Sequence, residues 1–99
     1  MNVPTAFSEK FGPDLLLAVK ILQEEGCSEI FLFGSVARGE ARTESDLDLA
    51  VRGCPRGRFF SLIGRLLFEL EHPVDLVNLD MQVALAQYLK REGLLVQIA

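Results

Sequence analysis

Apolar and polar positions alternate in blocks along the chain, and the spacing within each block differs. Residues 13–25 (PDLLLAVKILQEE) place apolar side chains at helical spacing, and Gly26 follows where a helix C-terminal cap is expected. Residues 29–33 (EIFLF) form a short apolar run rich in strand formers, which stops at Gly34 and Ser35. The pattern therefore predicts a first helix and then a buried strand that ends in a tight turn.

The rest of the chain continues this alternation of strands and helices. The spacing predicts a short helix over 35–39, a strand over 47–51, an amphipathic helix over 59–71, a strand over 74–79 and a helix over 81–93. The last segment, LLVQIA, fits either a strand or a helix tail. We therefore expect an α/β sandwich in a single domain spanning residues 1–99, with antiparallel pairing of two strands left open.

Two details of these elements are specific enough to test. The helix over 59–71 carries a set of apolar positions that we expect to be part of the core: Phe59, Phe60, Ile63, Leu66, Leu67 and Leu70. Asp80, just before the last predicted helix, is expected to be its N-cap.

Composition excludes several classes of protein. The net charge is -4, which argues against strong binding to nucleic acid through its phosphates. No stretch approaches the roughly 20 apolar residues of a membrane span. The first residues lack the pattern of a secretory signal. We expect a cytoplasmic protein with no membrane partner.

The cysteines and the histidine suggest no metal cluster. Cys27 and Cys54 are far apart and outside any CxxC pair, and His72 is the only histidine, so a zinc site lacks ligands. We expect two reduced, partly buried thiols, and we assign His72 no role.

The junction at Gly34 and Ser35 is the first candidate site. A strand that runs into a tight turn and a helix start presents free backbone N–H groups to an anion, and glycine lets a phosphate approach closely. An ordinary turn with a serine N-cap would give the same short pattern. Gly34 to Gly39 has the GxxxxG spacing of a P-loop, but Glu40 stands where that motif needs lysine, and GxGxxG is absent.

Three aspartates form the second candidate site. Asp46 and Asp48 fall on one face of the strand over 47–51, about 7 Å apart, where a divalent cation would offset their repulsion. A solvated strand face is the alternative. Asp75 lies among apolar neighbours in the next strand and completes a three-carboxylate cluster if the two strands are adjacent.

Arginines are concentrated beside these residues. Five of the seven lie between the Gly34 turn and the helix over 59–71, and guanidinium groups suit bidentate phosphate contacts. We expect Arg38 and Arg42 to contact a triphosphate, and Arg56 and Arg58 to be solvated surface charges.

Together, Gly34-Ser35, then ten residues, then Asp46-x-Asp48 and a lone Asp75 on the next strand form one pattern. It resembles the nucleotidyltransferase domain of the DNA polymerase beta superfamily. The stretch GSVARGEARTESDLDLAV is similar to the minimal nucleotidyltransferases that act as antitoxin partners of HEPN-domain toxins. The resemblance covers nearly the whole chain. It implies a nucleotidyltransferase fold of the α+β kind, with helices packed on a small mixed sheet of three to four strands.

The resemblance also implies a role for each residue. Gly34 and Ser35 would hold the β- and γ-phosphates of ATP or another NTP. Asp46 and Asp48 would coordinate two Mg²⁺ ions, for which Mn²⁺ can substitute, and Asp75 would bind the catalytic one and help deprotonate the acceptor. The implied activity is magnesium-dependent transfer of a nucleoside monophosphate, AMP from ATP, to a hydroxyl of a partner HEPN toxin.

Two other functions fit the sequence. One is a non-catalytic antitoxin or partner-binding module that covers its partner. The other is a small-molecule nucleotidyltransferase of the aminoglycoside type, which needs a pocket that so short a chain can hardly build alone.

Overall fold

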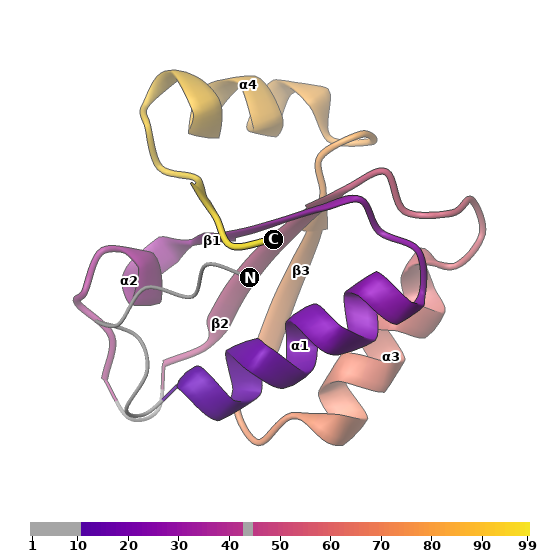
Figure 1. Ribbon diagram of the computed structural model, residues 1–99. Helices are drawn as coiled ribbons and strands as arrows, with labels where there is room; N and C mark the ends of the chain where they lie inside the picture. Colours follow the sequence, from indigo (N-terminus) through magenta and orange to yellow (C-terminus); the bar gives the residue numbers. More distant parts are fainter. Residues whose placement is uncertain (1–10, 43–44) are drawn as a thin grey trace.

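The computed structural model describes residues 11–42 and 45–99. Its elements are, in chain order, α1 (Gly12–Glu24), β1 (Glu29–Phe33), α2 (Gly34–Ala37), β2 (Leu47–Arg52), α3 (Phe59–Glu69), β3 (Val74–Asn78), α4 (Val83–Arg91) and β4 (Val96–Gln97) (Figure 1). Each helix and strand predicted from the spacing is present, and the C-terminal segment forms the short strand β4. None of the described helices has the length and apolar character that crossing a membrane requires.

The four strands form one mixed sheet in the order β3-β2-β1-β4. β1 is antiparallel to both of its neighbours, whereas β2 and β3 are parallel. Parallel neighbours need a crossover connection, and α3 supplies it between β2 and β3. The structure thus confirms a small mixed sheet of the α+β kind.

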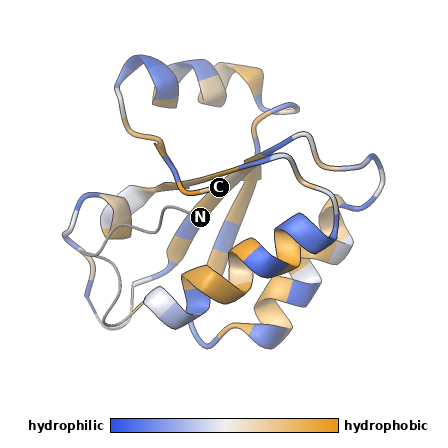
Figure 2. Cartoon of the chain, viewed as in Figure 1, coloured by the Kyte–Doolittle hydropathy of each residue, from blue (hydrophilic) through white to orange (hydrophobic). Residues whose placement is uncertain are grey.

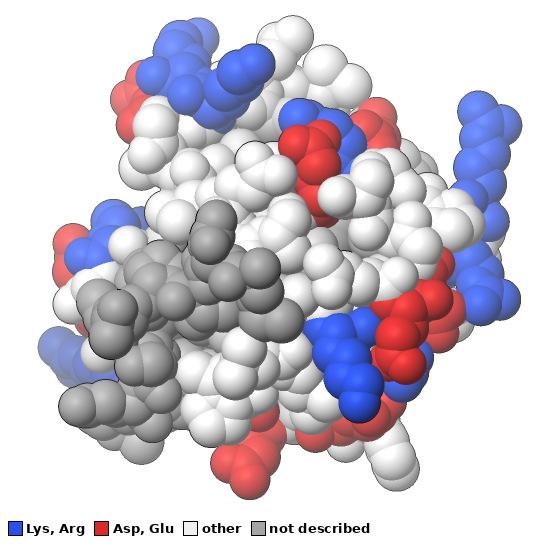
Figure 3. Space-filling model, in the orientation of Figure 1, with Lys and Arg blue, Asp and Glu red and all other residues white. Residues whose placement is uncertain are grey.

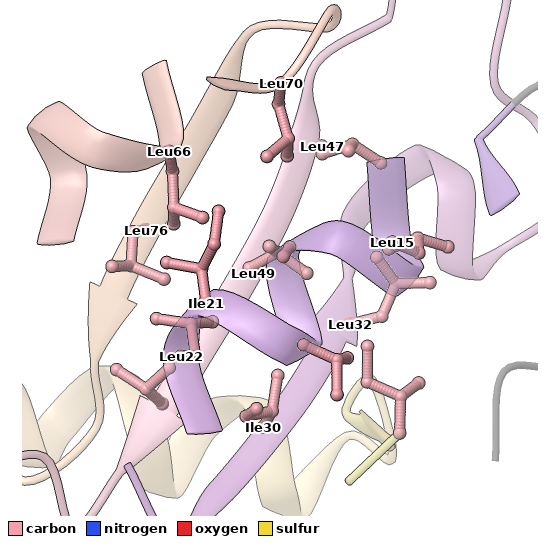
Figure 4. Packing of buried hydrophobic residues seen from close by; sticks show 14 of the residues in the cluster. Leu15, Ile21, Leu22, Ile30, Leu32, Leu47, Leu49, Leu66, Leu70 and Leu76 are labelled. Atoms are coloured by element: carbon pink, nitrogen blue, oxygen red, sulfur yellow. The ribbon is translucent and has the colours of Figure 1, made fainter. Parts of the chain in front are cut away.

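Helices cover both faces of the sheet. α1 and α3 lie on one face and α4 on the other (Figure 1). Because strand side chains alternate between faces, Leu47 and Leu49 belong to the core beneath α1 and α3, whereas Ala50 belongs to the smaller core beneath α4. Figure 4 shows the larger core, in which leucine and isoleucine side chains of α1, α3 and three strands interdigitate. Asp48, between Leu47 and Leu49, therefore points to the α4 side.

Ion pairs tie α3 to the end of α1. Arg65 lies 3.2 Å from a Glu25 carboxylate oxygen, 3.7 Å from one of Glu24 and 2.7 Å from one of Glu69 on its own helix. Acidic and basic side chains lie side by side on this side of the molecule, on the right in Figure 3. These pairs fix the side of α3 that faces α1, which leaves a different side of α3 facing outward.

Two predictions about α3 and α4 are wrong. Phe60 and Leu67 are not core residues, because they lie on the side of α3 opposite the buried Leu62 and Leu66. Asp80 is not the N-cap of α4, which begins after Gln82. Its carboxylate instead accepts a hydrogen bond of 2.7 Å from the backbone N–H of Gly53.

The cysteines are not reduced thiols, because Cys27 and Cys54 form a disulfide. The antiparallel register of β1 and β2 explains the pairing. Glu29 stands opposite Arg52, and continuing that register two residues outward places Cys27 opposite Cys54. The two cysteines are far apart in the sequence, but the antiparallel pairing of β1 and β2 brings them together.

Asp14 holds the loop between α3 and β3. It is a buried carboxylate, and it accepts hydrogen bonds from the backbone N–H groups of Glu71 (3.2 Å) and His72 (2.7 Å). The ring nitrogen Nδ1 of His72 lies 2.7 Å from the same carboxylate. Burial opposes ionisation of Asp14, but the hydrogen bonds from His72 and Glu71 outweigh it and lower its pKa.

Replacing Asp14 by Ala should cost about 2–3 kcal/mol of unfolding free energy, because two loop N–H groups lose their acceptor. The folded pKa of Asp14 lies below its unfolded value. Asp14 therefore stabilises the folded state at pH values above its unfolded pKa, near 4. This stabilisation is lost as the pH falls through the folded pKa. Urea unfolding followed by circular dichroism at pH 7 and at pH 3 measures both effects. Glu92→Ala, which removes only a surface ion pair, is the control. An equal loss at both pH values would contradict this role.

Candidate active site

The predicted phosphate turn lies where β1 meets α2. β1 ends at Phe33, and α2 begins immediately at Gly34, whose φ of 72° lies in the left-handed region that favours glycine. The backbone then turns into one short helix that contains Ser35. The first N–H groups of a helix have no acceptor within it, so this junction presents donors beside the end of β1.

The sheet brings two of the predicted acids into register. Asp48 of β2 is the direct partner of Asp75 on β3, and Asp48 is also the partner of Phe33 at the end of β1. Neighbouring strands lie roughly 4.8 Å apart, so the two carboxylates start from adjacent backbone positions. Asp46 precedes β2 by one residue and is exposed. The three acids and the Gly34 turn therefore share one end of the sheet.

The charges at this end of the sheet affect Asp48 most. Its pKa is raised, first by desolvation and then by the negative charges of Asp75 and Asp46, while Arg38 opposes the shift. Asp48 forms no ion pair or hydrogen bond with the side chains of residues 11–42 and 45–99. A half-buried carboxylate beside two like charges is stabilised by a cation placed between them.

Gly34 and the Asp48 carboxylate fit closely against each other. A Cβ atom on Gly34 would overlap a carboxylate oxygen of Asp48 and lie 2.8 Å from its Cγ. Gly39, which has a similar φ of 73°, has open space where its Cβ would stand. Glycine is therefore required at position 34 for two reasons, its backbone conformation and the position of Asp48.

The two predicted phosphate-binding arginines are placed differently. Arg38 follows α2, lies 3.4 Å from the carboxylate of Glu40 and is close enough to Asp48 to act on its pKa. Arg42 is exposed, and its backbone N–H donates a hydrogen bond of 2.8 Å to the Ser45 hydroxyl. Only Arg38 is thus shown beside the acids.

The donor set suits a divalent metal, because hard carboxylate oxygens on two adjacent strands are what magnesium prefers. Among residues 11–42 and 45–99, no three His, Cys, Asp or Glu side chains close around one point as a metal site. Asp46 and Asp75 are exposed, so their carboxylates can turn toward Asp48 without repacking the core. The residues therefore fit a metal at Asp48, with their side chains in a more open arrangement than a bound ion would impose.

The contacts that hold the loop before Asp75 were not predicted from the sequence. Asp14 and His72 fix the loop that leads directly into Asp75, and Pro73 in that loop accepts a 2.8 Å hydrogen bond from the N–H of Leu47. Asp14 lies in the first turn of α1, where an acidic residue is common. Its burial, which makes it structural, follows only from the packing of α1 against the loop.

Comparison with known protein families identifies the family to which the chain belongs. The family described as "Polymerase beta, Nucleotidyltransferase" matches residues 18–97. The chain belongs to this family and is a nucleotidyltransferase. Members of the family generally use divalent metals, in agreement with the donor set at Asp48. A search of curated proteins found no significant match.

Solved structures share the fold. A chain of a toxin-antitoxin structure with AMP-PNP is 28% identical with a TM-score of 0.66, and the match covers 80% of this chain and 67% of that one. A chain of the toxin-antitoxin MntA-HepT is 24% identical with a TM-score of 0.63, covering 86% and 68%. A putative nucleotidyltransferase from Sulfolobus solfataricus is 20% identical with a TM-score of 0.52, covering 85% and 84%.

Gly34→Ala and Gly39→Ala form a matched pair of tests. Both place an alanine at positive φ, so each should lower the unfolding free energy by about 1–2 kcal/mol. Only Gly34→Ala displaces the Asp48 carboxylate, so only it should also remove nucleotidyl transfer and weaken Mn²⁺ binding. Urea unfolding, activity and calorimetry with Mn²⁺ measure the three effects. Equal Mn²⁺ affinity in the two variants would show that Gly34 does not position Asp48.

Asp48→Asn should raise the melting temperature at pH 7 in the absence of metal. The folded pKa of Asp48 lies above its unfolded value, so its charged form destabilises the native state above the unfolded pKa, and the difference disappears as the pH falls below about 4. Asp80→Asn is the control, and it should not melt higher, because it removes a charge that accepts a hydrogen bond from Gly53 and lies 3.7 Å from Arg52. Differential scanning calorimetry measures the melting temperatures of the parent and of both variants. A lower melting temperature for Asp48→Asn would assign Asp48 a structural role.

Proposed function

We propose that this nucleotidyltransferase uses magnesium to transfer AMP from ATP to a hydroxyl group on a partner toxin of the HEPN class, and so acts as its antitoxin. The observation that carries the proposal is the register of Asp48 with Asp75 beside the Gly34 turn, which gathers metal ligands and phosphate donors at one end of the sheet. The 28% identical chain comes from a toxin-antitoxin structure with AMP-PNP, which supports both an adenine nucleotide and a toxin partner.

The chain's own residues have separable tasks in this proposal. The N–H groups at Gly34 and Ser35 bind the terminal phosphates, and Arg38 neutralises part of their charge. Asp46 and Asp48 hold the metal that accompanies the triphosphate, and Asp75 holds the one nearest the acceptor. When bound, two such ions stabilise the attacking and leaving oxygens of an in-line displacement.

We favour a partner protein over a small acceptor, because the 28% identical chain belongs to a toxin-antitoxin structure. A cavity of about 510 Å³ is lined by Cys54, Phe59 and Asp80 among others, so it lies at the opposite ends of β2 and β3 from Asp48 and Asp75. This cavity gives a small molecule no place beside the acids. A protein partner brings its own surface and can present a side-chain hydroxyl directly to the end of the sheet.

A binding module without catalysis is the second candidate, because the similar chains come from toxin-antitoxin complexes, in which an antitoxin can act by covering its partner. It and the enzyme differ in one measurable way. The enzyme changes the covalent mass of its partner, whereas the binding module leaves that mass unchanged and inhibits through a stable complex.

Incubation of the chain with the partner toxin, ATP and Mg²⁺ should add whole AMP units to a Tyr, Ser or Thr of the toxin, measured by intact-mass spectrometry. Asp48→Asn should abolish the addition and weaken ATP binding. Asp75→Asn should abolish the addition and keep much of the ATP affinity, because it serves the acceptor side. Asp80→Asn, at the far end of the strands, should keep transfer below its melting temperature. An unmodified but inhibited toxin would favour the binding module.

A further inference from the structure

The outer face of α3 carries apolar side chains that face solvent. Phe60 is 85% exposed and Phe68 is 91% exposed, and Leu67 beside them is 54% exposed. They lie on the side of the helix opposite Leu62 and Leu66, which pack into the core. Much of α3 is correspondingly apolar in Figure 2. A helix that is apolar on both sides has one side ready for a partner.

The exposed residues are arranged symmetrically around Gly64. Phe60, Gly64 and Phe68 recur at intervals of four residues and therefore form one ridge along the helix. Nothing lies within 4 Å of the position a Cβ would take on Gly64, so the ridge has a notch at its centre between two aromatic rings. The order of side chains along the ridge, Phe-Gly-Phe, is the same in both directions. The ridge is therefore complementary to an antiparallel copy of itself.

The charges at the ends of α3 are also complementary in that orientation. Arg56 and Arg58 precede the helix, whereas Glu69 and Glu71 lie at its end. Within residues 11–42 and 45–99, neither Arg56 nor Glu71 forms an ion pair. An antiparallel pair brings the basic end of one helix beside the acidic end of the other and also aligns the helix dipoles favourably. A parallel pair would place like charges together.

The available area is sufficient for a modest interface. An aromatic side chain buries about 150–250 Å² when covered, so the four phenylalanines of two copies supply about 600–1,000 Å². Leu67 and the stems of the terminal arginines and glutamates extend this toward the roughly 1,200 Å² at the lower end of specific interfaces. This area suits a reversible dimer.

We propose that two copies of this chain associate through antiparallel α3 helices, with a two-fold axis at Gly64 and Phe60 of each copy packed against Phe68 of the other. The acids point to the α4 side of the sheet, whereas α3 covers the opposite side. The dimer therefore leaves both candidate active sites open. This proposal does not depend on nucleotidyl transfer.

Sedimentation velocity of the chain alone tests the association. The mass should rise from 11.0 kDa toward twice that value as the concentration increases through the micromolar range. Phe68→Glu should raise the dissociation constant at least about tenfold, because a buried aromatic contact at the interface centre is replaced by a charge. Tyr88→Glu is the matched control, since Tyr88 is 48% exposed and lies on α4, on the other face of the sheet. Circular dichroism confirms that each variant is folded.

Two further measurements test the orientation. Arg56→Glu and Glu71→Arg should each weaken the dimer, and the double variant should recover the parent's dissociation constant, because the reversed charges meet across the axis. Gly64→Cys should give a disulfide-linked dimer under mild oxidation, whereas Phe60→Cys should not. The parent, with Cys27 and Cys54 bonded to each other, supplies the background.

Three results would overturn the proposal. The first is a parent chain that stays monomeric at every concentration. The second is a dimer that Phe68→Glu does not weaken. The third is a monomeric chain whose complex with a partner toxin is lost in Phe68→Glu, which would assign this face to the toxin instead.

Discussion

β2 lies between an antiparallel neighbour, β1, and a parallel neighbour, β3, and its two registers set the position of the candidate site. A slip of one residue between β2 and β3 would separate Asp48 from Asp75, and one between β1 and β2 would turn Asp48 toward the leucine-rich core. The same slip would move Asp48 away from Gly34. Both registers are held by the alternation of Leu47, Leu49 and Val51 into the larger core, because exposing that set would cost several kcal/mol. Burial of apolar side chains on one face of the sheet thus determines the position of Asp48 on the other face.

The site itself works against the stability of the fold. Burial raises the pKa of Asp48, and the negative charges of Asp75 and Asp46, which lie near the starts of β3 and β2, raise it further. A chain of 99 residues has a small core to offset such a cost. Stabilising contacts are accordingly found just outside the site. Asp14 fastens the loop before Asp75, and the disulfide closes the other end of the hairpin formed by β1 and β2. The acids can therefore remain close together before any cation arrives.

The sequence predicted local structure well because periodicity and turn residues are local signals. The bounds of β1 were predicted to the residue, and Gly34 marked the end of that strand. The adjacency of Asp48 and Asp75 could be stated only as a condition, since strand order depends on packing across the whole chain. Phe60 and the cysteines were misjudged for the same reason, and the burial of Asp14 was not predicted at all. Each has an ordinary local pattern, and its burial, exposure or bonding is decided by a distant segment.

β3 is an edge strand of the sheet that residues 11–42 and 45–99 form, and within these residues one edge of its backbone has no neighbour. An unpaired edge invites a strand from another molecule, and natural sheets deter this with charged side chains or very short edge strands. At the opposite edge, β4 has only two residues. At the β3 edge, Asp75 is an exposed charge of this kind, so the proposed metal ligand would also oppose association through that edge. Neutralising that acid, by substitution or by a cation, would therefore lower colloidal stability even where the fold is unchanged.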